Sequence, residues 1–281
     1  MRASQLRSAA GLAYREGPPE GEAADAPPVL CIHGFPETSY MWRSVLDAVA
    51  ASGRRAIAPD LPAFGDSPPD PPGTWAQHVD AIAGFHEALG LGRVWLVVHD
   101  WGGLIGLRWA CDHPEAIAGL VISDTGFFPD GRWHGMAKAL QEEGQGEQLL
   151  DAFERQGFGK MLASFSPGFD EKAADEYWRV FGTEEGRLAV LTFYRTCDFS
   201  ELEPYQDQLA ALKVPTLLLW GENDQFAPLG GAYRFKKLLP QAELVVVEGA
   251  GHFVYADEPR RCAREVVDFL NRSREAEAAA A

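Results

Sequence analysis

The amino-acid sequence predicts an α/β fold in which a mostly parallel sheet carries helices on both faces and is interrupted by an inserted helical block. First, short runs rich in Val, Ile and Leu alternate with longer segments of helical periodicity, a pattern typical of strands buried on both faces of a parallel sheet. Second, this alternation stops at about residue 127 and resumes after about residue 205. A chain of 281 residues, 46 % of them hydrophobic, is long enough for one such domain with an insertion.

The first half of the chain contains the expected strands and helices in strict alternation. The strands are uninterrupted apolar runs that end at Gly, Pro or Asp, and the helices are longer and repeat apolar residues at helical spacing. In chain order we expect the strand PVLCIHG (28–34), the helix YMWRSVLDAVAASG (40–53), the strand RRAIAPDL (54–61), the helix TWAQHVDAIAGFHEALG (74–90), the strand RVWLVVHD (93–100), the helix GGLIGLRWACDHP (102–114) and the strand IAGLVISD (117–124).

The second half begins with several helices and no convincing strand, including DEKAADEYWRVF (170–181) and EEGRLAVLTFYR (184–195). We therefore predict a core in two parts, 1–126 and 206–281, with a helical cap over 127–205. The low-complexity segments at 16–28 and 274–281 are expected to be solvated. The core resumes with the strand VPTLLLWG (214–221), the helix LGGAYRFKKLLP (229–240), the strand AELVVVEG (242–249) and the helix EPRRCAREVVDFLN (258–271).

Composition argues against several function classes. The formal net charge of −16 disfavours a nucleic acid or an anionic membrane as partner. No apolar run approaches the length of a membrane span, and the first residues lack the apolar block of a signal peptide. No His and Cys pair has the spacing of zinc ligands, so we expect no metal. Free, buried thiols of a cytoplasmic protein are expected for Cys31, Cys111, Cys197 and Cys262.

Candidate chemical groups lie at the ends of the predicted strands, where parallel α/β sheets collect their functional residues. Asp100 follows a strand and precedes two glycines that permit a sharp turn into a helix. Asp224 and His252 follow two later strands, so the chain order is nucleophile, acid, histidine. The backbone N–H groups of Phe35 and Trp101 are candidate donors to an oxyanion.

These motifs resemble those of the α/β-hydrolase superfamily, in the branch with an aspartate nucleophile that contains epoxide hydrolases and haloalkane dehalogenases. The resemblance covers nearly the whole chain. It implies a hydrolase without a cofactor, acting with water on a small apolar epoxide or haloalkane, and it leaves the oligomeric state open. It also implies a cis peptide before Pro36. The matching stretches are HGFPETSYMWR (33–43), APDLPAFGDS (58–67), HDWGG (99–103), WGEND (220–224) and GAGHF (249–253).

An aspartate nucleophile indicates which kind of carbon is attacked. A serine that attacked an sp³ carbon would form an ether that the enzyme could not hydrolyse, whereas Asp100 would form an alkyl ester that water can cleave. His252, oriented by Asp224, is expected to activate that water. Asp124, which ends another strand, is the alternative acid, because some dehalogenases of this branch carry their acid there. His33 and His99 are expected to pack or to support their neighbours.

The sequence contains residues typical of both reactions, so two leaving groups stay open. Tyr194, in LTFYR, resembles the second cap tyrosine of epoxide hydrolases, and His134 has the spacing of a variant in which histidine replaces the first; Tyr177 is the other candidate for that first donor. Phe35 also fits an epoxide hydrolase. The dehalogenase alternative is favoured by Val98, and by Trp133 or Trp178 as a second halide donor beside Trp101.

We therefore predict an epoxide hydrolase that forms an alkyl ester on Asp100, with a haloalkane dehalogenase as the alternative. A non-catalytic ligand-binding relative is a minor alternative, disfavoured because all three members of the triad are present. The pocket is expected to be largely apolar. Its expected substrate contacts are Phe35, Trp101, Phe128, Trp133 and Phe226, with Phe127 nearby.

Overall fold

An eight-stranded sheet forms the centre of the protein in the computed structural model, which describes residues 5–20 and 26–280. The strand order is β1-β2-β4-β3-β5-β6-β7-β8. From β4 to β8 neighbouring strands are parallel, while β1, β2 and β4 pair antiparallel at one edge. The strands are β1 (Gln5–Ala9), β2 (Leu12–Gly17), β3 (Val29–Ile32), β4 (Ala56–Pro59), β5 (Val94–His99), β6 (Ile117–Ser123), β7 (Thr216–Gly221) and β8 (Glu243–Val247).

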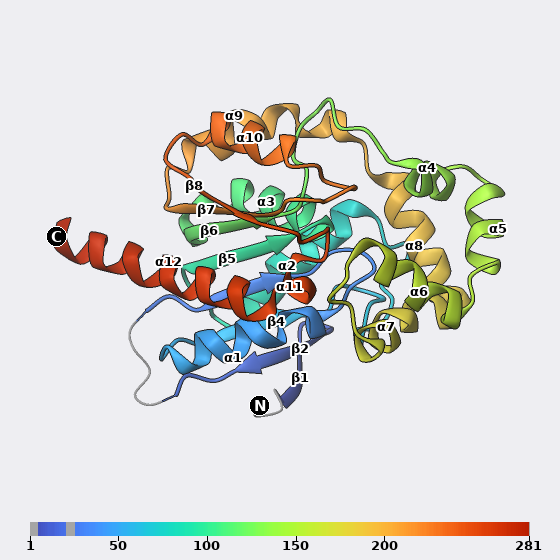
Figure 1. The fold of residues 1–281 in the computed structure, drawn as a ribbon, viewed down its shortest axis with the longest axis horizontal. Helices are drawn as coiled ribbons and strands as arrows, with labels where there is room; N and C mark the ends of the chain where they lie inside the picture. Colours follow the sequence, from blue (N-terminus) through green and yellow to red (C-terminus); the bar gives the residue numbers. More distant parts are fainter. Residues whose placement is uncertain (1–4, 21–25, 281) are drawn as a thin grey trace.

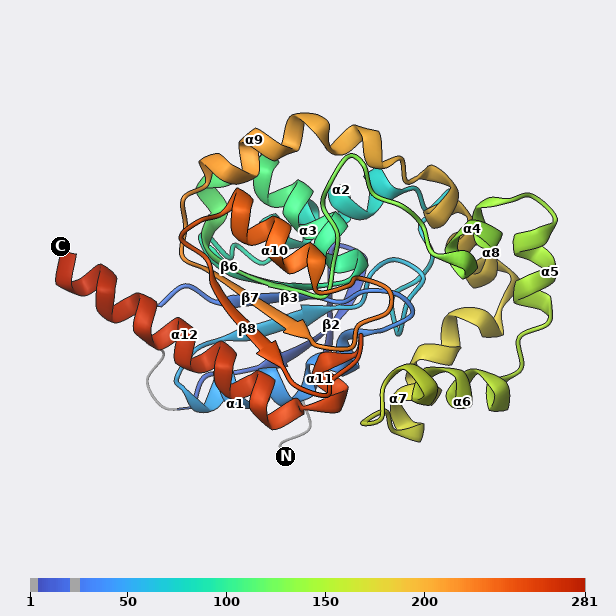
Figure 2. The ribbon, with the colours of Figure 1, turned by 45° about the horizontal axis from the view of Figure 1, so that its top comes forward.

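Helices cover both faces of this sheet, which confirms the predicted fold class. Helices α1 and α12 pack against each other on one face, and α2, α3, α9 and α10 lie on the other (Figure 2). The strands β3, β5 and β6 are buried along their whole length because both faces are covered. The helices are α1 (Arg43–Ala51), α2 (Trp75–Ala88), α3 (Trp101–Asp112), α4 (Gly135–Gln141), α5 (Gln145–Asp151), α6 (Arg155–Phe165), α7 (Glu171–Trp178), α8 (Glu184–Thr196), α9 (Glu203–Ala211), α10 (Gly230–Leu238), α11 (Val254–Asp257) and α12 (Pro259–Ala280).

The chain between β6 and β7 is helical in the structure. Helices α4 to α8, which we call the helical insertion, lie together at one end of the sheet, and α9 returns to pack against α3 (Figure 1). The predicted boundary at residue 205 falls inside α9, whose contact is with the core. The division of the chain into core and cap domains stays a prediction.

The sequence-based description was incomplete at both ends of the chain. The hairpin of β1 and β2 was not predicted, and Glu16 and Gly17, assigned to a solvated linker, belong to β2. Glu16 is buried and pairs with Arg7 and Arg55. Such a strand is hard to recognise because polar residues interrupt its apolar pattern. At the other end, α12 continues through the low-complexity tail to Ala280.

Two further expectations can be compared with the structure. All four cysteines are free and buried, as predicted. Over residues 5–20 and 26–280, none of the helices combines the length and the apolar character needed to cross a membrane.

Candidate active site

Asp100 occupies a sharp turn between β5 and α3. Its backbone has φ 49° and ψ −122°, a conformation that is strained for a residue with a side chain. Glycines allow the turn to approach its neighbours closely. A Cβ at Gly102 would lie 2.7 Å from the carbonyl oxygen of His33, and one at Gly34 would lie 2.6 Å from the Asp100 carboxylate. The turn therefore presents the Asp100 side chain at the carboxyl end of the sheet.

The Asp100 carboxylate is held from two sides. The Phe35 N–H donates to Oδ1 at 2.8 Å, next to a cis peptide before Pro36, as expected. The other oxygen, Oδ2, lies 3.5 Å from His252 Nε2. Trp101, the second expected oxyanion donor, opens α3 directly after Asp100. The Thr125 hydroxyl donates to the Asp100 carbonyl oxygen at 2.6 Å, a contact that no sequence motif indicated.

His252 is oriented by Asp224. Its Nδ1 lies 2.9 Å from Asp224 Oδ2, and both side chains are buried. The other Asp224 oxygen accepts hydrogen bonds from the N–H groups of Phe226 and Ala227, at 2.7 and 3.0 Å. His252 therefore bridges the two carboxylates, with one ring nitrogen toward Asp224 and the other toward Asp100.

Asp124, the alternative acid, lies at the end of β6 with φ 43°. Its Oδ1 accepts a hydrogen bond from the Gly221 N–H at 2.8 Å. The carboxylate that contacts His252 Nδ1 is that of Asp224, and Asp124 is a neighbour of Asp224. The geometry thus brings the two candidate acids together but gives the contact with the histidine to one of them.

A buried hydrogen-bond network connects the loops that carry Phe35 and His252. His99 Nδ1 lies 2.7 Å from Glu37 Oε2, and its Nε2 lies 2.8 Å from the backbone oxygen of His252. Glu37 also accepts a hydrogen bond from the Gly34 N–H at 3.2 Å. His99 thus links the HGFPE turn to the histidine loop, which fits the supporting role expected for it.

Charge pairing dominates the ionisation of these groups. Burial alone would raise the pKa of Asp100, but the hydrogen bond and charge of His252, together with the Phe35 N–H, lower it below its ordinary value. Burial would likewise raise the pKa of Asp224, and His252 lowers it. For His252, burial would lower the pKa, but Asp224 and Asp100 raise it well above the ordinary value. These contacts favour the protonated form of the imidazole, which lies between two carboxylates.

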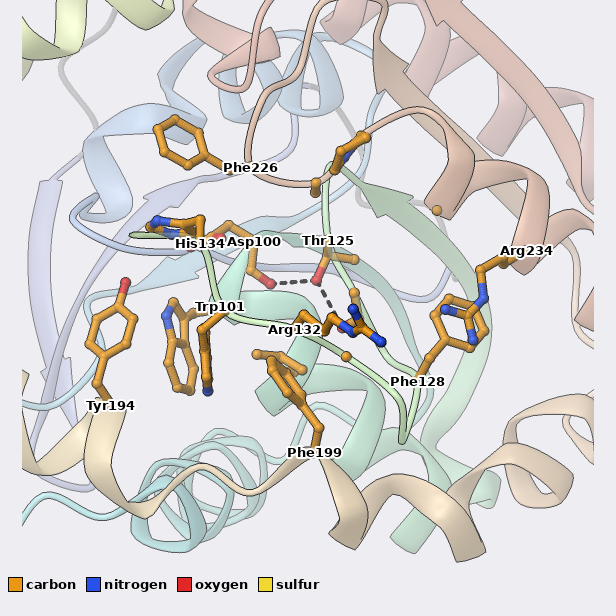
Figure 3. A pocket seen from close by; sticks show the side chains of 17 residues that line it. Asp100, Trp101, Thr125, Phe128, Arg132, His134, Tyr194, Phe199, Phe226 and Arg234 are labelled. Atoms are coloured by element: carbon orange, nitrogen blue, oxygen red, sulfur yellow. Dashed lines mark hydrogen bonds between the residues drawn. The ribbon is translucent and has the colours of Figure 1, made fainter. Parts of the chain in front are cut away.

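Asp100 lines a cavity of about 330 Å³, which we call the outer chamber (Figure 3). Its walls are formed by the turn between β5 and α3, the chain after β6, the start of α4 and the loop after β7. The outer chamber includes four predicted substrate contacts, Trp101, Phe128, Trp133 and Phe226, and also contains Thr125, Phe199, Arg132 and Arg234.

A second, smaller cavity of about 40 Å³, the inner chamber, is also lined by Asp100 and lies against the helical insertion. Phe35 and Phe226 line it, together with apolar residues that the sequence analysis did not single out. Four of them lie on α6 at helical spacing, the signal that could have identified this face. The unpredicted residues are Phe153, Phe158, Met161, Leu162, Phe165, Phe181, Met136 and Phe253.

Tyr194 and His134 line both chambers together with Asp100. Burial, and then the charge of Asp100, raises the pKa of the Tyr194 hydroxyl well above its usual value. Burial lowers the pKa of His134. Figure 3 shows the Tyr194 hydroxyl and the His134 ring at the side of the cavity where the Asp100 side chain lies.

Three other aromatic candidates lie elsewhere. Tyr177 is buried against Phe169 and is not among the residues that line the two chambers. Trp178 packs on Phe158 and Phe181 behind the inner chamber. Phe127 is fully buried beside Tyr205 and lines neither chamber, so the expectation that its side chain contributes to the pocket is wrong. In each case helical or loop geometry turns the side chain into a packed interior.

The described residues contain no group of three or more His, Cys, Asp or Glu side chains arranged to hold a metal ion.

Comparisons with known proteins point to one family. A family profile described as the alpha/beta hydrolase fold matches residues 27–259. A haloalkane dehalogenase of Mycobacterium marinum is 43 % identical, over 90 % of this chain and 86 % of that protein. Epoxide hydrolase 3 of Siraitia grosvenorii is 30 % identical, over 88 % of this chain and 92 % of that protein. The crystal structure of haloalkane dehalogenase DbeA from Bradyrhizobium elkani superimposes with a TM-score of 0.84 at 26 % identity, covering 97 % of this chain and 98 % of that one.

Proposed function

Because this chain belongs to the α/β-hydrolase fold family, in the branch of the haloalkane dehalogenases and epoxide hydrolases, we propose that it is an epoxide hydrolase with Asp100 as its nucleophile. The chain is a hydrolase of this branch, and the choice of substrate is the proposal. The observation that carries it is that Tyr194 and His134 line the same cavity as Asp100.

In the first step Asp100 Oδ2 attacks one carbon of the epoxide ring. The new C–O bond is an ester bond, and the ring C–O bond breaks with its electron pair on the epoxide oxygen. Oδ2 is the attacking oxygen because it has no backbone donor among the described residues, whereas Oδ1 accepts the Phe35 N–H. The leaving oxygen takes a proton or a strong hydrogen bond from Tyr194, assisted by His134.

Both donors have the protonation state that this step needs. The raised pKa of Tyr194 keeps its hydroxyl protonated. The lowered pKa of His134 favours its neutral form. His134 Nδ1 accepts the Ala137 N–H at 3.5 Å as the N-cap of α4, so the proton of the neutral ring lies on Nε2, free to donate.

In the second step water cleaves the ester. His252 Nε2 takes a proton from water, the hydroxide adds to Cγ of Asp100, and negative charge develops on Oδ1 beside the Phe35 N–H. Collapse of this intermediate releases the diol and restores the Asp100 carboxylate. The proton taken from water leaves His252 protonated, as it is in the free enzyme. The proton that His252 loses once the ester has formed returns Tyr194 to its neutral form, so the net reaction consumes one water.

Formation of the ester prepares His252 to act as the base. In the free enzyme the negative charges of Asp224 and Asp100 hold the pKa of His252 high, which keeps it protonated. Alkylation removes the charge of Asp100. The pKa of His252 then falls, and the imidazole can lose its proton to become the base of the second step.

Haloalkane dehalogenation is the second candidate, and it is favoured by the indoles in the outer chamber. Trp101 and Trp133 stack with ring centroids 5.3 Å apart. The 43 % identical relative is named a haloalkane dehalogenase. The argument from Val98 carries less weight, because that side chain is buried in the core against Gly106.

Product analysis with two substrates tests the proposal. The purified protein is incubated with styrene oxide and, separately, with 1-bromobutane, and diol and bromide are measured. We expect diol as the main product. Tyr194→Phe should lower its rate of formation about 100-fold, whereas Tyr233→Phe, on an exposed tyrosine of α10, should leave it unchanged. Bromide without diol would establish the second candidate.

A trapped intermediate tests the nucleophile independently. His252→Gln should still form the ester but hydrolyse it slowly, so mass spectrometry should find one substrate equivalent on the peptide that contains Asp100. A modified peptide elsewhere, or none with either substrate, would contradict the role of Asp100.

A further inference from the structure

Asp124 is a fully buried carboxyl group for which the proposed reaction has no use. One of its oxygens, Oδ1, accepts the Gly221 N–H at 2.8 Å. The other, Oδ2, is buried and receives no hydrogen bond from any donor among the described residues. A buried carboxylate oxygen without a donor is costly, so an ionised Asp124 would be poorly accommodated here.

Apart from the Gly221 N–H, the group that acts most strongly on Asp124 is another acid. Asp224 affects Asp124 both through its charge and as a side-chain hydrogen-bond partner. The other titratable groups that act on Asp124 or are acted on by it are His252, Tyr255 and Cys262. Of these only His252 can carry a positive charge, and that charge is already placed between Asp224 and Asp100.

The local energetics therefore favour one negative charge on the pair of acids. Burial, followed by the charge of Asp224, raises the pKa of Asp124 well above its ordinary value, while Asp224, in contact with His252 and two N–H groups, has a lowered pKa. Two carboxylates in contact cannot both ionise easily, and the hydrogen-bond donors lie on the Asp224 side.

We propose that Asp124 is a neutral carboxylic acid in the working enzyme and donates its proton in a hydrogen bond to the Asp224 carboxylate, which it thereby holds against His252. Asp124 is a positioning residue, because it acts through Asp224 and is not among the residues that line either chamber. A proton on Oδ2 turns the orphaned acceptor into a donor with a partner. The inference rests on the proposed role of His252 and Asp224 and holds for either leaving group.

This hydrogen bond moderates the basicity of His252. The donated proton draws charge from Asp224, so the pKa of His252 is lower than it would be beside an unassisted carboxylate. In the ester intermediate His252 must lose its proton to act as the base. Asp124 therefore extends ester hydrolysis to lower pH.

Two substitutions separate this role from a structural one. Asp124→Asn keeps an uncharged donor of the same size, and Asp124→Ala removes the donor. We expect the asparagine variant to keep its rate of ester hydrolysis within about threefold, with an unchanged acid limb of the pH profile. The alanine variant should hydrolyse the ester about tenfold more slowly near neutral pH, with its acid limb moved to higher pH, while Asp100 is alkylated at the wild-type rate.

The opposite protonation state gives opposite results. If Asp124 were ionised, Asp124→Asn would remove a negative charge near His252, and the acid limb would move to lower pH. If Asp124 were itself the acid on His252, Asp224→Asn would retain ester hydrolysis. Either result would overturn the proposal.

Infrared difference spectroscopy reads the protonation state without relying on activity. The spectrum of the wild-type protein minus that of Asp124→Asn should contain the C=O band of a protonated carboxylic acid at neutral pH. A carboxylate band in its place would refute the inference. If the wild-type protein forms no ester on Asp100 with either substrate, the proposed function fails, yet this spectrum still decides the state of Asp124.

Discussion

At the scale of single residues, the charge on Asp100 couples the two steps of the proposed reaction. Asp100 is the only one of the two carboxylates on His252 that loses its charge when the ester forms. Its lowered pKa and the raised pKa of His252 arise from the same contact between Oδ2 and Nε2, 3.5 Å apart. The two steps should therefore respond differently to pH.

The ester should accumulate as the pH falls. Alkylation needs an ionised Asp100, whose lowered pKa keeps it ionised into the acid range. Hydrolysis needs a neutral His252, so it slows by about tenfold per pH unit once the pH drops below the pKa of His252 in the ester. Rapid quenching followed by mass spectrometry at a series of pH values measures the esterified fraction. An esterified fraction that stays constant or decreases with acid would contradict the coupling.

At the scale of elements, the turn between β5 and α3 depends on how closely α3 approaches β3. Gly102, in the first turn of α3, faces the end of β3, where a Cβ would lie 2.7 Å from the His33 carbonyl oxygen. Backbone atoms cannot move aside as a flexible side chain can. The position of Asp100 therefore depends on Gly102, which lets two backbone segments come into contact, and on Gly34, which leaves room for the Asp100 side chain.

Gly102→Ala should destabilise the protein by about 1–3 kcal/mol, because the added methyl group overpacks this contact. Urea unfolding measures the change. The matched control is Gly157→Ala, at an exposed position of α6 where a Cβ would meet nothing within 4 Å. That variant should be more stable by about 0.5–1 kcal/mol, since alanine has the higher helix propensity. Equal effects of the two substitutions would show that the close contact is unimportant.

Helix α6 forms one wall of the inner chamber. One face of α6 lines this chamber with Phe158, Met161, Leu162 and Phe165, and Phe35 and Asp100 line the same chamber. This face gives the chamber an apolar wall that can adapt at Met161, because the unbranched methionine side chain changes its shape readily. The helical insertion thus contributes most of the apolar residues that line the inner chamber.

At the scale of the whole molecule, the excess of negative charge is the dominant feature. The formal net charge is −16, and the sequence pI is about 4.8. Within residues 5–20 and 26–280, three ion pairs join the core to the helical insertion, namely Arg15–Glu176, Arg43–Asp170 and Arg179–Asp66. Partly exposed pairs of this kind contribute little to stability. Repulsion among the remaining carboxylates should therefore outweigh them.

The melting temperature at pH 7 should rise by a few degrees when NaCl is increased from about 10 to about 150 mM, since salt shortens the range of this repulsion. Differential scanning fluorimetry measures the shift. Choline chloride serves as a control, and an equal effect would indicate screening rather than binding of sodium. A melting temperature that falls with salt would show that the ion pairs contribute more than the repulsion.

The predicted order of core strands and helices from Val29 onward is confirmed, because a sheet buried on both faces requires continuous apolar runs that are visible in the sequence. The hairpin of β1 and β2 escaped prediction, since edge strands carry mixed polar and apolar residues. The catalytic assignments stay predictions. The structure nevertheless brings Asp100, His252 and Asp224 into one chain of contacts.

The fold class and the identity of the groups at the strand ends could be predicted from the amino-acid sequence alone, because periodicity and short motifs are local properties of the chain. The three-dimensional contacts were needed to show which of two acids touches His252, and that Tyr177, Trp178 and Phe127 do not line the two chambers. These outcomes depend on contacts between residues far apart in the chain. The direction of a side chain in a packed helical insertion is set by its neighbours in space, which spacing along the sequence does not specify.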